Sequence, residues 1–104
     1  MNYTIEITES RAMKLFTEKF GNDIDSRIEK FKEESKELFE AYDEYKEDPT
    51  IKNTEHLKDE MSDAYCVLKH LAYCFGLIHE ELLNMGVDKV TKRELNPNYK
   101  RYEK

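Results

Sequence analysis

Apolar residues recur along most of this chain with the spacing of amphipathic helices. Residues 1–9 are the exception, because they are rich in β-branched side chains and favour an extended segment. Thr8 is then the predicted N-cap of the first helix. The helical spacing covers residues 11–20, 27–45, 55–75 and 79–95. The pattern therefore predicts an all-α bundle of four or five helices.

Capping residues and helix breakers separate these predicted helices. The predicted stop signals are Gly21-Asn22, Asp48-Pro49-Thr50, Gly76 and Asn96-Pro97-Asn98. Either Asp23 or Asp25 can cap the second helix, and Asn53-Thr54 is the candidate cap of the third. Gly86 lies inside the fourth helix and marks either a kink or a close helix contact.

Acidic residues follow the apolar stripes of the second and third helices in a repeated arrangement. The stripes are formed by Phe31, Leu38 and Tyr42 in the second helix and by Leu57, Ala64 and Leu68 in the third. At about 100° per residue, Glu34/Glu37 and Glu60/Asp63 take the same positions at the edge of their stripes. Packing the two stripes together brings four carboxylates to one rim, where they repel unless protons or a cation intervene. This arrangement predicts a divalent metal site.

Pairs of acidic residues three or four positions apart are common in a chain with 23 Asp and Glu residues. The proposed ligands are therefore compared with the other acidic residues of the second helix. Glu40, Glu44 and Glu47 also lie three or four residues apart, but Glu40 and Glu44 fall at about −120° and −80° from Glu34, further from the stripe. They are expected to form a solvated face with nearby lysines. Asp63 is harder to explain this way, because aspartate is a poor residue for a helix interior. The alternative hypothesis is a non-catalytic acidic helical module that dimerises or binds a basic protein.

The length and composition of the chain limit the fold and the partners. A chain of 104 residues suffices for one domain over residues 1–104, with a core at about 10–95 and a C-terminal tail at 96–104. Only three glycines and two prolines occur, which favours long helices. The net charge of −6 argues against duplex nucleic acid and anionic membranes as partners.

The cysteines and the hydropathy pattern indicate a cytoplasmic protein. No apolar run approaches the roughly 20 residues of a membrane span. Cys66 and Cys74 lie about 12 Å apart along one predicted helix, which is too far for a disulfide. The three histidines have no mutual spacing suited to one zinc site, and surface or capping roles are expected for His56, His70 and His79.

The acidic pattern resembles a known family signature. Glu33-Glu34-Ser35-Lys36-Glu37, followed after 22 residues by Glu60-Met61-Ser62-Asp63, is similar to the EExxE…ExxD motif of the all-α nucleotide pyrophosphohydrolases. That superfamily includes MazG-like enzymes, dimeric dUTPases and phosphoribosyl-ATP pyrophosphohydrolases. The flanking segments Leu15–Gly21 and Gly76–Arg93 extend the resemblance to roughly residues 12–95.

The resemblance implies a set of metal ligands and catalytic residues. It makes Glu34, Glu37, Glu60 and Asp63 ligands of Mg²⁺, with Mn²⁺ as a substitute. It makes Glu33 and Glu34 the catalytic carboxylates, with Glu33 either supporting the ligands from behind or orienting water. Hard oxygen ligands suit Mg²⁺, which keeps several waters and shares its coordination shell with substrate phosphates.

The resemblance also implies a reaction and an assembly. Members of the family hydrolyse a nucleoside triphosphate between its α and β phosphates and release pyrophosphate. Lys89 and Arg93 then contact the phosphate tail, although a cationic helix C-terminus that complements the helix dipole explains them equally well. Lys92 is a weaker candidate for the same role. A homodimer or homotetramer is expected from the family.

Overall fold

The computed structural model describes the backbone of residues 3–96 and 98, and the side chains of this range from residue 11 onward. Its helices are α1 (Tyr3–Phe20), α2 (Ile24–Glu47), α3 (Ile51–Cys74) and α4 (His79–Glu94). No strand occurs among the described residues. The predicted all-α fold is therefore confirmed. Of the predicted tail, residues 97 and 99–104 lie outside the described part of the chain.

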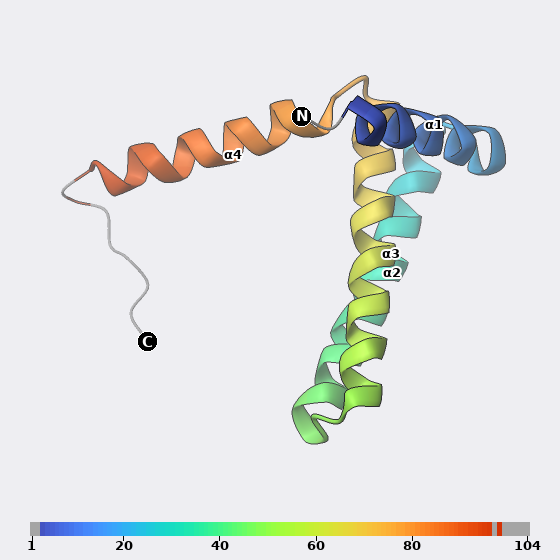
Figure 1. The fold of residues 1–104 in the computed structure, drawn as a ribbon, viewed down its shortest axis with the longest axis vertical. Coiled ribbons are helices and arrows are strands. Elements are labelled where there is room, and N and C mark those ends of the chain that lie inside the picture. Colours follow the sequence, from blue (N-terminus) through green and yellow to red (C-terminus); the bar gives the residue numbers. More distant parts are fainter. Residues whose placement is uncertain (1–2, 97, 99–104) are drawn as a thin grey trace.

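An antiparallel hairpin of α2 and α3 is the centre of the fold (Figure 1). Helix α1 lies across one end of this hairpin and packs on α3. Helix α4 extends away from the other three helices, and none of its residues is buried. The first three helices therefore build one small core, whereas α4 leaves its apolar residues exposed.

The buried line of α2 contains charged residues. Arg27, Glu34 and Ala41 are the buried residues of this helix, and they lie seven residues apart, so they share one face. The sequence pattern instead predicted an apolar line with Glu34 at its edge, and this detail was wrong. Tyr42 and Leu68, which belong to the two predicted stripes, are about half exposed. The contact face of the hairpin is thus rotated toward the acidic edge.

Helix α1 begins earlier than the sequence predicted. Residues 3–9 are helical rather than extended, and Thr8 lies inside α1 rather than at its N-cap. Each added residue of a helix gains a backbone hydrogen bond, whereas the propensity penalty of a β-branched residue is less than about 0.7 kcal/mol. Propagation of the helix therefore outweighs the local preference of this segment.

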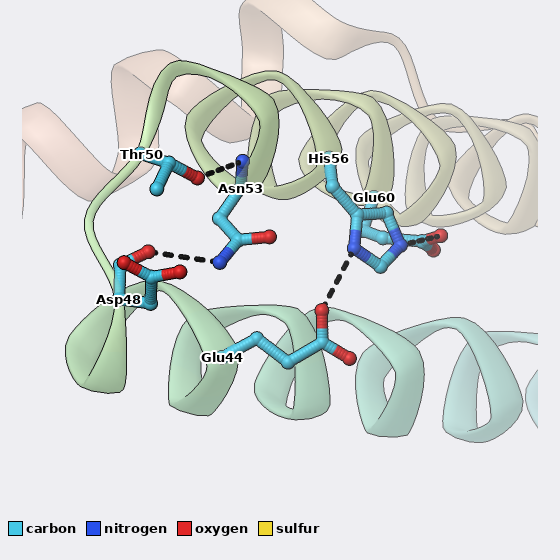
Figure 2. Close-up of polar contacts among 6 residues, drawn as sticks. All are labelled: Glu44, Asp48, Thr50, Asn53, His56 and Glu60. Atoms are coloured by element: carbon cyan, nitrogen blue, oxygen red, sulfur yellow. Dashed lines mark hydrogen bonds and ion pairs between the residues drawn. The ribbon is translucent and has the colours of Figure 1, made fainter.

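The hairpin turn is held by a cap that lies three to four residues before the predicted one. Thr50, not Asn53 or Thr54, caps α3, and its hydroxyl accepts a hydrogen bond from the Asn53 backbone N–H at 3.1 Å. The Asn53 side chain donates to the Asp48 carbonyl at 2.8 Å, which ties the end of α2 to the start of α3 (Figure 2). The cap of α2 is Asp23, whose carboxylate accepts from the Ser26 N–H at 3.0 Å.

Glycines end α1 and α3, as predicted. Gly21 and Gly76 have φ angles of 80° and 75°, which favour glycine over residues with a side chain. Gly86 has no atom of the described residues within 4 Å of the position that a Cβ would take, so it makes no close helix contact with that part of the chain. The turn at Gly76 and the two residues after it start α4 in its outward direction.

The Thr50 cap can be tested against the cap that the sequence suggested. Thr50→Ala removes an N-cap oxygen, so we expect it to lower the free energy of unfolding by about 1 kcal/mol. Thr54→Ala is the matched control, because the Thr54 hydroxyl only donates to a carbonyl at 2.8 Å. Alanine also has the higher helix propensity, so Thr54→Ala should cost little. Denaturant unfolding followed by circular dichroism measures both, and equal losses would contradict the assignment.

Candidate metal centre

Facing turns of α2 and α3 bring three of the predicted ligands together. One carboxylate oxygen from each of Glu34, Glu37 and Glu60 lies within 4.8 Å of the other two. A second group, formed by Asp59, Glu60 and Asp63, meets the same criterion. Glu60 belongs to both groups and links Asp63 to the carboxylates of α2. All four predicted ligands thus lie in one continuous acidic cluster, which also includes Asp59.

Glu34 is the buried member of this cluster. It is only 7% exposed, and its Oε1 forms an ion pair with the Lys30 ammonium at 3.1 Å. The other oxygen, Oε2, is buried without a hydrogen-bond partner, and so is Oε2 of Glu60. A buried polar atom without a partner costs about 1–3 kcal/mol, and more when it is charged. Both unpartnered oxygens belong to carboxylates suited to a hard cation.

Mutual repulsion within the cluster changes the titration of Glu37. The negative charge of Glu34 is the largest cause that raises the pKa of Glu37, followed by partial burial and the charge of Glu60. Lys30 relieves part of this repulsion, and its hydrogen bond to Glu34 raises the pKa of Lys30. Glu33, the predicted water-orienting residue, is more exposed and lies 3.6 Å from the same ammonium.

His56 joins the cluster, which the sequence did not predict. Its Nδ1 lies 3.2 Å from Oε2 of Glu44, and its Nε2 lies 3.4 Å from Oε1 of Glu60 (Figure 2). Ionised carboxylates only accept hydrogen bonds, so the contact to Glu44 uses a proton on Nδ1 of His56. The sequence held a partial signal, because His56 precedes Glu60 by four residues. The contact to Glu44 depends on the register between α2 and α3, which the sequence pattern does not determine.

A cavity of about 260 Å³ adjoins the acidic cluster at the α1 end of the hairpin. Glu34 and Asp63 line this cavity as well as belonging to the cluster. The remaining lining residues come from α1, α2 and α3 and are Phe16, Phe20, Arg27, Lys30, Cys66, Val67 and His70. Sequence analysis did not identify this cavity, because its aromatic wall comes from a separate helix.

The predicted phosphate contacts lie away from this cluster. Lys89 and Arg93 are exposed residues of α4, which extends away from the hairpin (Figure 1). Lys92 forms an ion pair with Asp88 of its own helix at 2.9 Å. Within one chain, the structure therefore does not bring these cations to the carboxylates, because α4 contacts α3 at its first residue, where His79 meets the Tyr65 ring edge to face at 6.0 Å, and then extends away.

Comparison with known proteins finds no matching family model, no significantly similar curated protein and no significantly similar solved structure. The family resemblance therefore rests on the acidic motif and its flanks. Among the described residues, no helix combines the length and the hydropathy that crossing a membrane requires.

Neutralising Glu37 should stabilise the metal-free protein. A raised pKa means that the folded state holds the proton of Glu37 more tightly than the unfolded state does. Ionised Glu37 therefore destabilises the fold above its folded-state pKa, and this effect disappears as the pH falls below the ordinary value for glutamate. In chelator at neutral pH, Glu37→Gln should melt at a higher temperature than the wild type.

Glu40→Gln is the control for this measurement, because Glu40 is exposed and the Lys36 ammonium that it pairs with lies 3.9 Å away. Thermal melts at neutral pH and near pH 4 compare the two variants. A gain for Glu37→Gln that persists unchanged at the lower pH, or that Glu40→Gln matches, would contradict the repulsion described here.

Proposed function

We propose that this protein is a Mg²⁺-dependent nucleoside triphosphate pyrophosphohydrolase. Its substrate is a ribo- or deoxyribonucleoside triphosphate, and its products are the nucleoside monophosphate and pyrophosphate. The observation that carries the proposal is the cluster of Glu34, Glu37 and Glu60 across two helices, with buried oxygens that lack a partner. The EExxE…ExxD pattern of the sequence supports the same reaction.

The donor set of the cluster fits magnesium. All of its candidate ligands are carboxylates, and Mg²⁺ binds through one or two carboxylates, several waters and substrate phosphates. Glu34, Glu37, Glu60 and Asp63 are the residues that would hold the ion, and Mn²⁺ would be a substitute. When bound, the ion neutralises phosphate oxygens and lowers the pKa of a coordinated water.

The side chains of the chain itself supply the remaining steps. Glu33, beside Glu34 and at the exposed edge of the cluster, accepts the proton of the attacking water. The oxygen of this water ends on one of the two phosphates of the α–β bridge, and the bridging P–O bond breaks. One water is consumed, and pyrophosphate leaves with the β and γ phosphates.

A homodimer or homotetramer forms part of this proposal. The apolar side chains of α4 are exposed, and Leu82, Leu83, Val87 and Val90 line a shallow apolar groove on this helix. Association of two chains would cover such a surface. It would also give Lys89 and Arg93 of one chain access to substrate phosphates in another.

The same exposed surface supports the second candidate function, a non-catalytic acidic helical module that dimerises or binds a basic protein. This alternative needs no ion at the cluster. Its prediction is that charge changes at Glu40 and Glu44 affect the protein as much as changes at Glu34 and Glu60. The two functions therefore differ in which carboxylates matter.

Pyrophosphate release is the direct test of the enzymatic proposal. Purified protein incubated with nucleoside triphosphates and Mg²⁺ should release pyrophosphate and monophosphate. Glu34→Gln and Glu60→Gln should each lower kcat/KM by more than about 100-fold, because each removes a charged ligand. Glu40→Gln is the matched control and should retain activity. Release of orthophosphate alone, or equal losses in all three variants, would contradict the proposal.

Metal binding can be tested without turnover. Mg²⁺ at about 100 times its Kd should stabilise the folded state by about 2.7 kcal/mol through mass action. We expect the resulting rise in melting temperature for the wild type and for Glu40→Gln, and its loss in Glu60→Gln. A sodium salt at equal ionic strength controls for screening, and an equal effect of that salt would favour the acidic module.

A further inference from the structure

The Lys30 ammonium holds the buried carboxylate of the candidate metal centre. Its Nζ lies 3.1 Å from Oε1 of Glu34 and 3.6 Å from Oε2 of Glu33. Oε2 of Glu34 is buried and has no partner, so a hydrated ion that enters from solvent meets this carboxylate at Oε1. Lys30 already occupies that oxygen, and two cations on one oxygen repel each other. A metal ion that binds Glu34 therefore competes with the Lys30 ammonium.

The metal-free protein needs a positive charge at this position. Glu34 is 7% exposed, and an ionised carboxylate at that burial is costly without a positive partner. The carboxylates of Glu37 and Glu60 lie beside it and add their negative charge. The Lys30 ammonium thus supplies one positive charge at the carboxylate where a divalent ion would supply two.

The geometry of this ion pair favours its displacement. Lys30 precedes Glu34 by four residues, and this order is the weaker orientation for opposite charges on a helix. The Lys30 side chain is 37% exposed, and its flexible stem carries a strongly hydrated head group. Lys30 also lines both the cavity beside the cluster and an open groove along the first half of α2. The ammonium can therefore turn into the solvent of this groove without a movement of the helices.

We propose that Lys30 is a tethered counterion of the metal centre, which holds Glu34 in the metal-free protein and gives it up to Mg²⁺. Lys30 thereby keeps the hairpin stable without metal, and it weakens the affinity of the site for Mg²⁺. It is a positioning residue, because it acts through Glu34 and not on the substrate. This inference rests on the metal site of the proposed function and adds a regulating group to that site.

Calorimetric titration of Mg²⁺ into the nucleotide-free protein measures this competition. Lys30→Met keeps the aliphatic stem and removes the charge. We expect it to lower the Kd for Mg²⁺ by about tenfold or more, because a hydrogen bond to an ionised group no longer has to be broken. Lys30→Arg keeps a cation at this position and should bind Mg²⁺ no more tightly than the wild type.

Lys32→Met is the matched control, because it removes the same charge from the same helix. Lys32 pairs at 3.2 Å with Glu29, an exposed carboxylate outside the acidic cluster. Its loss should leave the Kd for Mg²⁺ nearly unchanged. An equal gain of affinity in Lys30→Met and Lys32→Met would show a general effect of net charge and would overturn the proposal.

Two further measurements do not depend on the affinity of a variant. In chelator, Lys30→Met should melt at a lower temperature than Lys32→Met, because it leaves Glu34 buried without its cation. In the wild type, lysine-selective NMR follows the ammonium groups directly. Addition of Mg²⁺ should make the Lys30 ammonium protons exchange faster with water and leave those of Lys32 unchanged. Unchanged exchange at Lys30 when the site is saturated would overturn the proposal.

The outcomes are separable from those of the enzymatic proposal, because the titration contains no nucleotide. Tighter Mg²⁺ binding in Lys30→Met than in Lys32→Met supports the counterion role, even if pyrophosphate release fails. Mg²⁺ binding by the wild type with an equal or higher Kd in Lys30→Met overturns the counterion role and leaves the metal centre in place. Absence of Mg²⁺ binding from both the wild type and Lys30→Met overturns both.

Discussion

The whole structure depends on burying charged side chains between α2 and α3. The buried line of α2 consists of Arg27, Glu34 and Ala41, and two of these three residues are ionisable. Desolvating charges at a helix contact is costly unless they are paired. Ala41, and Ala64 on α3, are both buried, and such small side chains leave room for the helices to approach closely. Packing thus brings the carboxylates together at an electrostatic cost.

Basic side chains offset part of that cost. Lys30 holds one oxygen of Glu34, and His56 lies between Glu44 and Glu60. Neither contact reaches the two unpartnered oxygens, Oε2 of Glu34 and Oε2 of Glu60. A partly neutralised cluster with free oxygens is what a reversible cation site requires. Full neutralisation by protein cations would leave nothing for an ion to bind.

The sequence predicted the hairpin well, because long amphipathic helices carry their signal in many positions. The matched phase of Glu34/Glu37 and Glu60/Asp63 came from helical geometry alone, and the structure places all four in one cluster. The errors concern helix ends, where a single contact determines which residue begins the helix. Thr50 and Thr54 are the same residue type and have the same preference for the N-cap position. The path of the chain in the turn determines that Thr50 is the cap. Local propensity likewise failed for residues 3–9, where helix propagation prevailed.

The sequence could not predict which residues of different helices meet, for a related reason. The sequence contains Thr17, Arg27 and His70, but their meeting depends on how α1 crosses the hairpin. A rotation of one helix by one residue, about 100°, would separate them. For the same reason the sequence misjudged the buried face of α2, since the apolar stripe and the acidic edge differ by less than that rotation. The sequence pattern shows which broad face of a helix is buried, whereas the residues that meet in a binding site depend on the register between neighbouring helices.

The shared residues of the cluster and the cavity give the two halves of the site a common origin. Glu34 belongs to the heptad line that holds the hairpin together, to the group of candidate metal ligands and to the wall of the cavity. Arg27, one heptad earlier, also lines the cavity, and its guanidinium lies over the Phe20 ring of α1. The spacing of seven residues that packs α2 on α3 therefore also sets the distance between the candidate metal ligand Glu34 and Arg27 at the wall of the cavity. One packing rule thus sets both the contact between the two helices and the layout of the candidate site.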